Sequence, residues 1–593
     1  MINLTINNQN VSVEEGSTVL AAARLLNIKI PTLCNHDDLC VAGNCRVCVV
    51  EQKGARTLIA SCATPAFEGM EINTNTLKVR NARKHIVELL LSEHRSDCTK
   101  CYKNQNCELQ SLANEYAFGD HILLDLVEGK NYNIDRSSPS FIKDDSKCIR
   151  CQRCVRTCHE LQSVSAIAVA KKGAHQKISS FHDRPMSHVV CTNCGQCVNR
   201  CPTGALVEKT YIDQVWDAIY DTDKHVVVQT APAVRVALGE DLGYDPGERV
   251  TGKMVNALKQ LGFDSVLDTD FSADLTIMEE GTELLVRLKK ALVNGDTKVS
   301  LPMFTSCSPG WIKFIEHKYP EFLPNLSTCK SPQQMFGALA KTFYAKKRNI
   351  DPSKIVSVSI MPCTAKKFEA DRPEMRASGY KDVDFVLTTR ELAVMIKQAG
   401  LDFRNLEEVG YDSVMGDSTG AAVIFGATGG VMEAALRTAY EIVTGREVPF
   451  TNLNITPVRG MEGVKEATVK IEGCVDEWKF LEGAELKVAI GHGLTNADKI
   501  MKAIRDGKAA YHFVEIMGCP GGCIGGGGQP IPTNMEIRAK RMKAIYSEDE
   551  HMKLRKSHEN PEVIAIYKEF LDEPNSHKSH ELLHTHYIAR ENY

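Results

Sequence analysis

Residues 148–158, CIRCQRCVRTC, and residues 191–202, CTNCGQCVNRCP, define the character of the first third of this chain. Each run spaces its cysteines as C-x2-C-x2-C-x3-C, and the second run ends in Cys-Pro. This spacing is typical of domains with two 4Fe–4S clusters, in which the fourth cysteine of each run binds the other cluster. Zinc sites more often use two separate cysteine pairs, so iron–sulfur clusters are favoured. The predicted ligands are Cys148, Cys151, Cys154, Cys158, Cys191, Cys194, Cys197 and Cys201.

A separate cysteine group lies within residues 1–78. The alternating pattern at the start predicts two short strands, and a helix is expected over 17–26. This arrangement, followed by a cysteine loop, resembles the β-grasp ferredoxins, which hold a 2Fe–2S cluster with four thiolates. The first spacing is longer than in plant-type ferredoxins, but the inner CxxC is kept. We expect Cys40 to be a loop thiol and the ligands to be Cys34, Cys45, Cys48 and Cys62.

A third cysteine group follows an apolar-periodic segment, ARKHIVELLLSEH at 82–94. One imidazole and three thiolates could together bind a 4Fe–4S cluster, and a neutral imidazole would tend to raise its potential. A zinc site with the same one histidine and three cysteines is the alternative. The neighbouring cluster motifs favour 4Fe–4S, with the ligands His94, Cys98, Cys101 and Cys107.

Composition narrows the class of protein. A chain of 593 residues is long enough for about three to five domains. Its net charge of −4 predicts no affinity for nucleic acid or an anionic membrane surface. The sequence has no apolar run of transmembrane length and no signal-peptide pattern at its start. The 22 cysteines indicate metal ligation in a reducing compartment, and we expect a cytoplasmic location.

From about residue 211 the sequence changes character, because helix and strand patterns alternate and cysteines become rare. HVVVQTAPAV at 225–234, SVSIMPC at 357–363 and LKVAIGHG at 486–493 each predict a strand that runs into a loop, where open α/β sheets place their sites. The predicted fold is multidomain, α+β and α/β. The expected segments are a β-grasp domain at 1–78, a helical 4Fe–4S domain with one histidine and three cysteine ligands at 79–118, a linker around 118–140, a two-cluster ferredoxin-like domain at 138–208, a catalytic α/β domain at 209–546 and a helical tail at 547–593.

Three loops of the α/β part resemble the signature loops of the iron–iron (FeFe) hydrogenases: FTSCSPGW at 304–311, MPCTAKKFEADR at 361–372 and EIMGCPGGCIGGGGQP at 515–530. The likeness covers essentially the whole chain and is closest to the catalytic subunits of NAD(P)-linked, electron-bifurcating forms. It implies an enzyme that interconverts dihydrogen with protons and electrons. We expect the glycines at 521, 522 and 525–528 to leave room for a bulky cofactor against the backbone.

The resemblance also implies an H-cluster, in which a 4Fe–4S cubane is joined through a cysteine sulfur to a two-iron unit with carbon monoxide, cyanide and azadithiolate ligands. By motif position, Cys363, Cys519 and Cys523 would bind the cubane, and Cys523 would be the bridge. Lys366 would hydrogen-bond a cyanide. The remaining pocket residues implied by the same matching are Pro232, Gln333, Met361 and Met517.

The first loop departs from the family, which usually has two adjacent cysteines there, the first relaying protons and the second binding the cubane. This chain keeps Cys307 but has Ser308 in the ligand's place. A hydroxyl is far less acidic than a thiol, and its oxygen is a harder ligand. Ser308 could bind iron through oxygen, Cys307 could turn inward as the ligand, or the cofactor could be held weakly or not at all. We expect oxygen ligation and a working site.

A proton relay is implied along IMEEGTELLVRLKK at 277–290. Glu280, Glu283 and Arg287 share one helical face and match the family's relay positions. With Ser327, they would carry protons between Cys307 and solvent. The first step suits a thiol whose pKa is shifted toward working pH.

The remaining signals concern partners. GATGGV at 426–431 and GHGLTN at 491–496 lack the full dinucleotide fingerprint, so we expect the nucleotide and flavin on another chain. The expected partners are a flavin- and NAD(P)-binding subunit, a small iron–sulfur subunit and ferredoxin. The alternatives are a stand-alone ferredoxin-dependent hydrogenase, and a hydrogen sensor or iron–sulfur scaffold without turnover. Residues expected to have no such role are the buried thiols Cys329 and Cys474 and the surface histidines His577, His580, His584 and His586.

Overall fold

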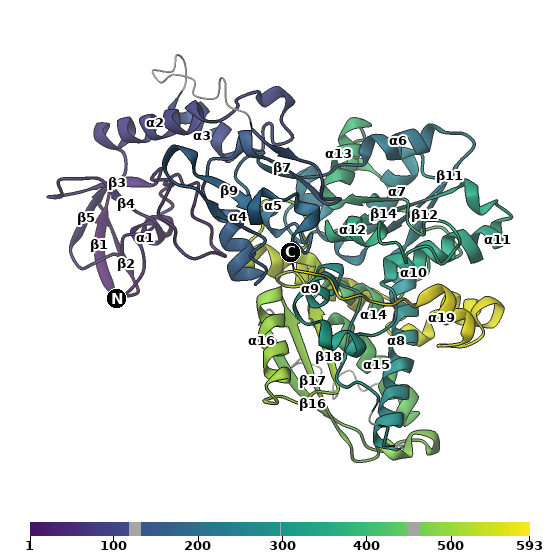
Figure 1. Ribbon diagram of the computed structural model, residues 1–593. Helices are drawn as coiled ribbons and strands as arrows, with labels where there is room; N and C mark the ends of the chain where they lie inside the picture. Colours follow the sequence, from purple (N-terminus) through teal and green to yellow (C-terminus); the bar gives the residue numbers. More distant parts are fainter. Residues whose placement is uncertain (118–131, 294, 297, 448–462, 593) are drawn as a thin grey trace. The chain divides into compact units, whose positions relative to one another are not determined.

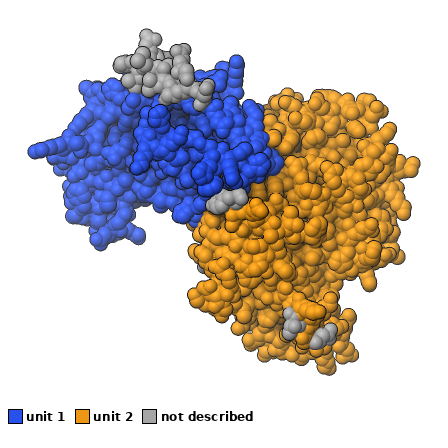
Figure 2. Space-filling model, viewed as in Figure 1, with its two compact units in different colours: residues 1–160, 165–189, 200–207 blue, residues 161–164, 190–199, 208–593 orange. Residues whose placement is uncertain are grey.

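The computed structural model describes residues 1–117, 132–293, 295–296, 298–447 and 463–592. These form two compact units (Figure 2). The first unit comprises residues 1–160, 165–189 and 200–207, and the second comprises 161–164, 190–199 and 208–593. Two short elements, α5 (Gln196–Arg200) and β10 (Leu206–Glu208), each cross a boundary between the units. Most of the expected linker lies outside the described residues.

The first unit opens with a five-stranded sheet of order β2-β1-β5-β3-β4. The strands of this sheet are β1 (Ile2–Ile6), β2 (Gln9–Val13), β3 (Val49–Gln52), β4 (Ile59–Ala60) and β5 (Met70–Asn73). Helix α1 (Val19–Leu25) lies between β2 and β3 in the sequence. Alternate side chains of β1, Leu4 and Ile6, point into a core shared with α1, as a period of two requires. The predicted strand pair and helix are therefore present, and α1 begins where Thr18 accepts a hydrogen bond from the Ala21 N–H.

The rest of the first unit is built from short elements that leave room for cysteine loops. They are α2 (Leu77–Ser92), α3 (Glu108–Tyr116), β6 (Ile134–Asp135), β7 (Phe141–Asp144), α4 (Arg153–Arg156), β8 (Ile167–Ala170) and β9 (Lys177–Ser180). Strands β6 and β7 pair antiparallel, as do β8 and β9. The apolar-periodic segment at 82–94 lies mostly in α2, and Val87 of this helix is fully buried.

The second unit contains two four-stranded sheets. Their strands are β11 (His225–Thr230), β12 (Ser265–Asp268), β13 (Met303–Phe304), β14 (Ile355–Met361), β15 (Phe385–Thr388), β16 (Val464–Lys470), β17 (Glu485–His492) and β18 (Phe513–Met517). The helices are α6 (Ile212–Tyr220), α7 (Thr251–Leu261), α8 (Thr269–Leu292), α9 (Pro309–Lys318), α10 (Pro332–Leu339), α11 (Ala345–Arg348), α12 (Ala365–Ala370), α13 (Thr389–Gln398), α14 (Gly420–Val423), α15 (Gly430–Thr444), α16 (Leu494–Arg505), α17 (Met535–His551), α18 (Pro561–Ile566) and α19 (His577–Leu583).

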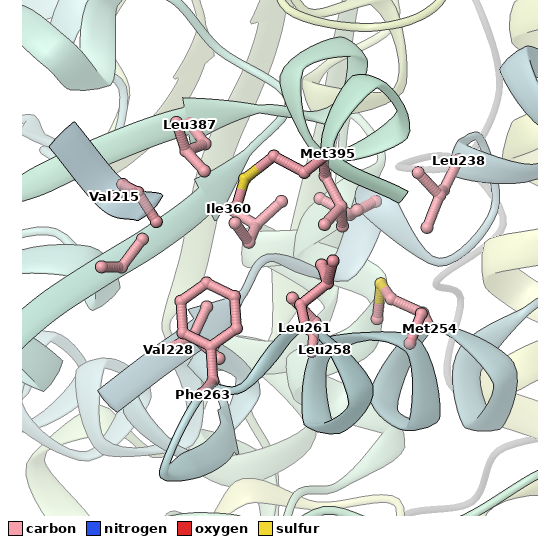
Figure 3. Packing of buried hydrophobic residues seen from close by; sticks show 14 of the residues in the cluster. Val215, Val228, Leu238, Met254, Leu258, Leu261, Phe263, Ile360, Leu387 and Met395 are labelled. Atoms are coloured by element: carbon pink, nitrogen blue, oxygen red, sulfur yellow. The ribbon is translucent and has the colours of Figure 1, made fainter. Parts of the chain in front are cut away.

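The sheet of order β12-β11-β14-β15 is entirely parallel and buried on both faces. Val226 and Val228 of β11 pack with α6, α7 and α13, and Figure 3 shows Val228 in this cluster beside Phe263. Val227 faces the opposite way and packs with α8 and α10. Burial on both faces explains why β11 reads as a continuous apolar run rather than an alternating one.

The other sheet has the order β13-β18-β17-β16, with only β16 antiparallel to its neighbour. In Figure 1, α16 and α15 lie on opposite sides of β17 and β18. Val514 and Ile516 of β18 pack with α9 and α16, whereas Phe513 packs with Met432 of α15. Both sheets are therefore sandwiched between helices, as expected for an α/β domain.

The C-terminal segment is tied to the α/β domain by buried contacts. Helix α17 runs across residue 547, where the sequence suggested a change of domain. Arg437 of α15 makes buried ion pairs with Glu433 and with Asp549 of α17. Among the described residues, none of the helices has both the length and the apolar composition needed to cross a membrane.

Candidate functional site

A cavity lies where strands of both sheets in the second unit end. It contains about 740 Å³ of space between atoms. Its walls follow the carboxyl ends of β11, β13, β14 and β18, which is where open parallel sheets place their sites. The structure brings the following sequence-predicted residues together around it: Pro232, Cys307, Ser308, Gln333, Met361, Cys363, Lys366, Met517, Cys519 and Cys523.

Three thiols of this cavity destabilise one another's ionised forms. Burial raises the pKa of Cys519, and the negative charges of Cys363 and Cys523 add to this effect. Burial also raises the pKa of Cys523, to about 12. Three buried thiolates of this kind are stable together only beside a cation, and sulfur donors prefer iron in a cluster, or zinc. The donor chemistry and the apolar space beside it fit a bound iron–sulfur cofactor.

Ser308 lines the same cavity as these three thiols. It precedes α9, and its Oγ accepts a hydrogen bond from the Gly518 N–H at 3.1 Å. Gly518 stands between Met517 and Cys519 in the third loop. The hydroxyl is therefore held at the cavity wall by backbone from the loop that carries two of the cysteines.

Lys366 and Gln333 are fixed in the wall by Glu369. Lys366 Nζ donates to Glu369 Oε2 at 2.9 Å and to the Cys307 carbonyl at 3.1 Å. Gln333 Nε2 donates to Glu369 Oε2 at 3.1 Å, while its Oε1 accepts from Ser359 Oγ at 2.9 Å. Since an ammonium group has three N–H bonds, Lys366 keeps one for a ligand in the cavity.

The glycines of the third loop fall into two groups. Gly522 and Gly526 line the cavity, as expected of glycines that leave room for a cofactor. A Cβ at Gly525 would collide with the Pro520 carbonyl, and one at Gly527 would collide with the Cys194 carbonyl. The loop that carries Cys194 is held there, since Gln196 Nε2 donates to the Gly525 carbonyl at 2.8 Å. Gly525 and Gly527 are therefore needed because protein backbone approaches them, a role that was not expected.

This packing places the second cysteine run beside the cavity. Burial raises the pKa of both Cys194 and Cys519, and the negative charge of Cys363 adds to the shift at Cys194 while that of Cys194 adds to the shift at Cys519. A cluster bound by the 191–197 loop would therefore be a near neighbour of one bound in the cavity.

The predicted relay residues follow one another from the cavity toward the surface. Glu280 is 3% exposed, and its Oε1 has no hydrogen-bond partner among the described residues. Burial, reinforced by the charge of Glu283, raises the pKa of Glu280 to about 8. Ser327 Oγ donates to Glu283 Oε2 at 2.9 Å, and Glu283 pairs with Arg287 at 2.6 Å. The side chain of Arg287 is 14% exposed, so the series ends near solvent.

Cys307 lies at the inner end of this series, but its acidity differs from the prediction. Burial, together with the charges of Glu280 and Cys523, raises the pKa of its thiol well above the usual value. The expectation of a pKa shifted toward working pH was wrong, because the sequence did not show how many negative groups surround this thiol. The raised pKa favours the neutral thiol of Cys307.

The structure also places the leftover cysteines. Cys329 is fully buried, as expected, and Cys474 is only partly buried. Cys40 is exposed, and its thiol donates to Glu160 Oε1 at 2.7 Å, as suits a loop thiol.

The tail histidines were expected on the surface, which is wrong for His584. It is 8% exposed, and its Nε2 lies 3.1 Å from Glu279 Oε2. His577, His580 and His586 are exposed. Sequence reasoning missed the pairing of Glu279 with His584, because the two residues are 305 positions apart and Glu279 does not share the helical face of the expected relay residues.

In the first unit, the four cysteines of the β-grasp segment cluster together. Cys34 is within hydrogen-bonding reach of Cys45 and Cys62, and the sulfurs of Cys48 and Cys62 are 3.3 Å apart. This grouping of four thiols fits the predicted 2Fe–2S cluster.

The segment with one histidine and three cysteines also retains donors suited to a metal cluster. Burial lowers the pKa of His94 to about 4, so its ring is neutral, which is the form that binds metals. Its Nδ1 is buried without a hydrogen-bond partner among the described residues. Burial raises the pKa of Cys101 and of Cys107, and smaller contributions come from the charge of Cys98 at Cys101 and of Cys101 at Cys107, so the three thiols are neighbours.

The crossed pattern expected for the two cysteine runs is visible in the first unit. A small cavity there is lined by the sulfur-bearing residues Cys148, Cys151 and Cys154 of the first run and by Cys201 of the second. The charge of Cys201 contributes to raising the pKa of Cys148 to about 11 and that of Cys151 to about 12. The fourth cysteine of the second run thus lies with the first three of the other run.

The pKa of Glu280 can be tested directly. Because burial favours the neutral acid, we expect this carboxyl to stay protonated at neutral pH and to ionise only as the pH rises through about 8. Infrared difference spectra of the unmodified protein, recorded against pH, should show the band of a protonated carboxyl group. The Glu280→Gln variant should lack this band, and the surface control Glu536→Gln should keep it. A band lost near the ordinary pKa of glutamic acid would contradict this assignment.

The glycine packing gives a second prediction. Gly527→Ala should push the Cys194 loop away, because the new methyl group would meet the Cys194 carbonyl. We expect the variant to lose iron equivalent to about one 4Fe–4S cluster. Iron analysis and paramagnetic resonance of the reduced protein measure this loss. The matched control is Gly410→Ala, since a Cβ there meets no atom within 4 Å. Full iron content and unchanged spectra in Gly527→Ala would show that the contact is dispensable.

Comparisons with known proteins agree with this layout. The family described as iron only hydrogenase large subunit, C-terminal domain, matches residues 224–527, and the iron hydrogenase small subunit family matches 535–590. Residues 1–77 match a 2Fe-2S iron-sulfur cluster binding domain, and 83–121 match the NADH-ubiquinone oxidoreductase-G iron-sulfur binding region. Residues 138–207 match the NADH-quinone oxidoreductase subunit 3, ferredoxin-like domain. The predicted fold class, the iron–sulfur clusters and the H-cluster are therefore confirmed.

Individual relatives match along the full chain. The NADP-reducing hydrogenase subunit HndD of Solidesulfovibrio fructosivorans is 51% identical over 100% of this chain and 99% of its own. Iron hydrogenase 1 of Clostridium pasteurianum is 40% identical over 99% of this chain and 100% of its own. The structure of a variant of the FeFe hydrogenase HydA1 of Chlamydomonas reinhardtii covers 65% of this chain and 100% of its own, with 44% identity and a TM-score of 0.58. This chain therefore belongs to the FeFe hydrogenase family, as a large subunit with N-terminal iron–sulfur domains.

Proposed function

We propose that this FeFe hydrogenase is the catalytic subunit of a multisubunit, NAD(P)-linked enzyme that exchanges electrons with a flavin-bearing subunit, a small iron–sulfur subunit and ferredoxin. The observation that carries this proposal is the full-length likeness to a subunit named as part of an NADP-reducing hydrogenase. Its several cluster domains would provide more than one route by which electrons leave the chain, as electron bifurcation requires. The reducing environment that the thiols need supports a cytoplasmic location.

The structure supports placing the nucleotide on another chain. A dinucleotide would need the free N-terminus of a helix for its pyrophosphate. At the start of α15, which overlaps GATGGV, the Glu515 carboxylate accepts hydrogen bonds from the Gly429 N–H at 2.6 Å and the Met432 N–H at 2.8 Å. At the start of α16, which lies within GHGLTN, Gln162 Oε1 accepts from the Leu494 N–H at 3.1 Å. The chain's own side chains therefore fill both helix starts.

We also propose the domain division set out from the sequence, at 1–78, 79–118, 138–208, 209–546 and 547–593, with helix α17 continuous across the last of these boundaries. In this arrangement electrons pass between the catalytic domain and the ferredoxin-like pair of clusters, and from there to the two N-terminal clusters. The packing of the Cys194 loop on the Gly525–Gly527 backbone supports the first of these steps. In the crossed arrangement, Cys158 of the first run would be the fourth ligand of the cluster bound by Cys191, Cys194 and Cys197.

For the catalytic site, we infer that Cys363, Cys519, Cys523 and Ser308 hold the cubane, with Cys523 as the bridge. Ser308 Oγ lines the same cavity as the three sulfurs and already accepts the Gly518 N–H. A hydrogen bond donated to an oxygen stabilises its anionic form, which is the form that would bind iron. Cys307 remains available for protons, because its thiol lies where Glu280 influences it.

When bound, the H-cluster supplies the metal centre at which dihydrogen is split or formed. The chain's own residues hold and move the protons. Cys307 holds a proton on Sγ at the cavity wall, and Glu280 exchanges it on a carboxyl that stays neutral below about pH 8. Ser327 Oγ then links this acid to Glu283, which pairs with Arg287 near solvent. Lys366 orients a polar ligand of the centre through its remaining N–H bond.

Two other functions remain as alternatives. A stand-alone ferredoxin-dependent hydrogenase is favoured by the full-length likeness to iron hydrogenase 1. Purification of the native protein with a flavin-bearing subunit would exclude it. A hydrogen sensor or a scaffold without turnover is favoured by Ser308 alone. Infrared bands of bound carbon monoxide and cyanide, together with hydrogen turnover by the matured protein, would exclude that role.

Replacing the thiol of Cys307 tests the relay. We expect Cys307→Ala to lower hydrogen evolution and uptake by at least about 100-fold, because an aligned general acid contributes about that much. Iron content and infrared bands should remain, since the thiol holds a proton rather than the cofactor.

The control for this variant is Cys474→Ala, a partly buried cysteine that the mechanism does not use. It should keep full activity. Hydrogen evolution retained by Cys307→Ala would defeat the relay assignment, and loss of cluster iron in this variant would show that Cys307 is a ligand.

A further inference from the structure

Three groups able to bind a metal ion meet beside the proton relay. The ligand atoms of Glu283, Cys329 and His584 lie within 4.8 Å of one another. Glu283 belongs to α8, Cys329 follows the relay serine, and His584 directly follows α19. Cys329 and His584 are antiparallel backbone partners, and the Lys330 N–H donates to the Leu583 carbonyl at 2.8 Å. Backbone pairing therefore holds the thiol and the imidazole together.

A carboxylate behind His584 provides a second, independent observation. Its Nε2 lies 3.1 Å from Glu279 Oε2, and Glu279 is fully buried. Glu279 is fixed in turn, because it accepts the Tyr567 hydroxyl at 2.6 Å and the Asn575 N–H at 2.8 Å. Metal-binding histidines usually use one ring nitrogen for the metal and the other for such a carboxylate. In this protein Glu279 lies beside Nε2 of His584, so Nδ1 is the ring nitrogen left to bind a metal. Without a metal, Nδ1 lies 2.8 Å from Thr328 Oγ1.

The donor types and spacings suit zinc. A thiolate, an imidazole and a carboxylate are the ligands that Zn²⁺ takes in proteins. With metal–ligand bonds of about 2.0–2.3 Å, the ligand atoms of a tetrahedral site lie about 3.3–3.8 Å apart. Cys329 Sγ and Glu283 Oε2 are 3.8 Å apart, and the others need only a small movement. Three protein ligands leave the fourth position to water.

The site also has a route from solvent. Cys329 is fully buried, and the His584 side chain is 4% exposed. The ring of His580, however, is exposed and lies with its centroid 4.0 Å from that of His584. A metal ion could therefore bind first to His580 and then pass inward.

We propose that Glu283, Cys329 and His584 form a zinc site, and that zinc bound there blocks the proton relay by occupying the Glu283 carboxylate. Binding replaces the proton of the Cys329 thiol by the metal, so one proton is released and no electron is transferred. Without zinc, Glu283 accepts the Ser327 hydroxyl and serves the relay. The blocking effect rests on the proposed function, whereas the metal site itself does not.

The test uses the full-length, cluster-loaded and matured protein. Zinc chloride is titrated while hydrogen evolution from a reduced dye is measured, and zinc absorption-edge spectra identify the bound atoms. We expect one zinc with a single sulfur ligand, and a hydrogen evolution rate at least tenfold lower at saturation. Cys329→Ala and Cys329→Ser should weaken zinc binding by at least about 10- to 100-fold. The matched control Cys474→Ala should bind zinc as the unmodified protein does, and an unchanged iron count shows that zinc has not displaced cluster iron.

The outcomes separate the two parts of the proposal. Zinc bound without a sulfur ligand, or equal affinity in the unmodified protein and both Cys329 variants, would overturn the site and leave the hydrogenase assignment intact. Zinc bound through sulfur with no loss of hydrogen evolution would overturn the blocking effect, and with it the place of Glu283 in the relay. Because the spectra of the unmodified protein are decisive alone, poor folding of a variant would not rescue the proposal.

Discussion

Parallel strands of one sheet all present their carboxyl ends at the same edge, and the cavity of this protein depends on that constraint in both sheets of the second unit. One sheet places Met361 at the end of β14 and Cys363 just after it, and the other places Cys519 just after β18. Strand β13 brings Cys307 and Ser308 to the same place. The positions of the ligands are thus set by hydrogen-bonded backbone, which is rigid enough to hold several mutually repelling thiolates for a cluster.

Close packing of backbone also links the proposed electron route to the catalytic site. The Cys194 loop packs so closely on the third loop that Gly527 has no space for a Cβ. The proposed proton route follows α8 and Ser327 instead, where Ser327 donates to Glu283. The proposed electron and proton routes are therefore built on different elements. The C-terminal segment contacts the proposed proton route through His584, at the proposed zinc site.

Much of this could be predicted from the sequence, because it depends on local patterns. The runs at 225–234 and 357–363 predict buried strands that end in loops, and the cysteine spacings predict the cluster ligands. The role of Gly527 could not be predicted, since only the folded chain shows which carbonyl approaches it. The same holds for the pKa of Cys307, which depends on the charges gathered around it. His584 pairs with Glu279 from 305 residues away, and no local pattern signals such a contact.

Ser308 lies where the resemblance to the family leads us to expect a cysteine ligand, so the proposed cubane depends on how the site holds this hydroxyl. The Gly518 N–H donates a hydrogen bond to Ser308 Oγ. This bond would stabilise the oxygen anion, which forms less readily than a thiolate. A crystal structure of the matured protein, with iron located by anomalous scattering, is the most direct measurement. We expect a cubane in the cavity, bonded by Cys363, Cys519 and Cys523, with Ser308 Oγ on its fourth iron. A cubane held by Cys307 instead, or three sulfurs gathered around a single zinc ion, would contradict it.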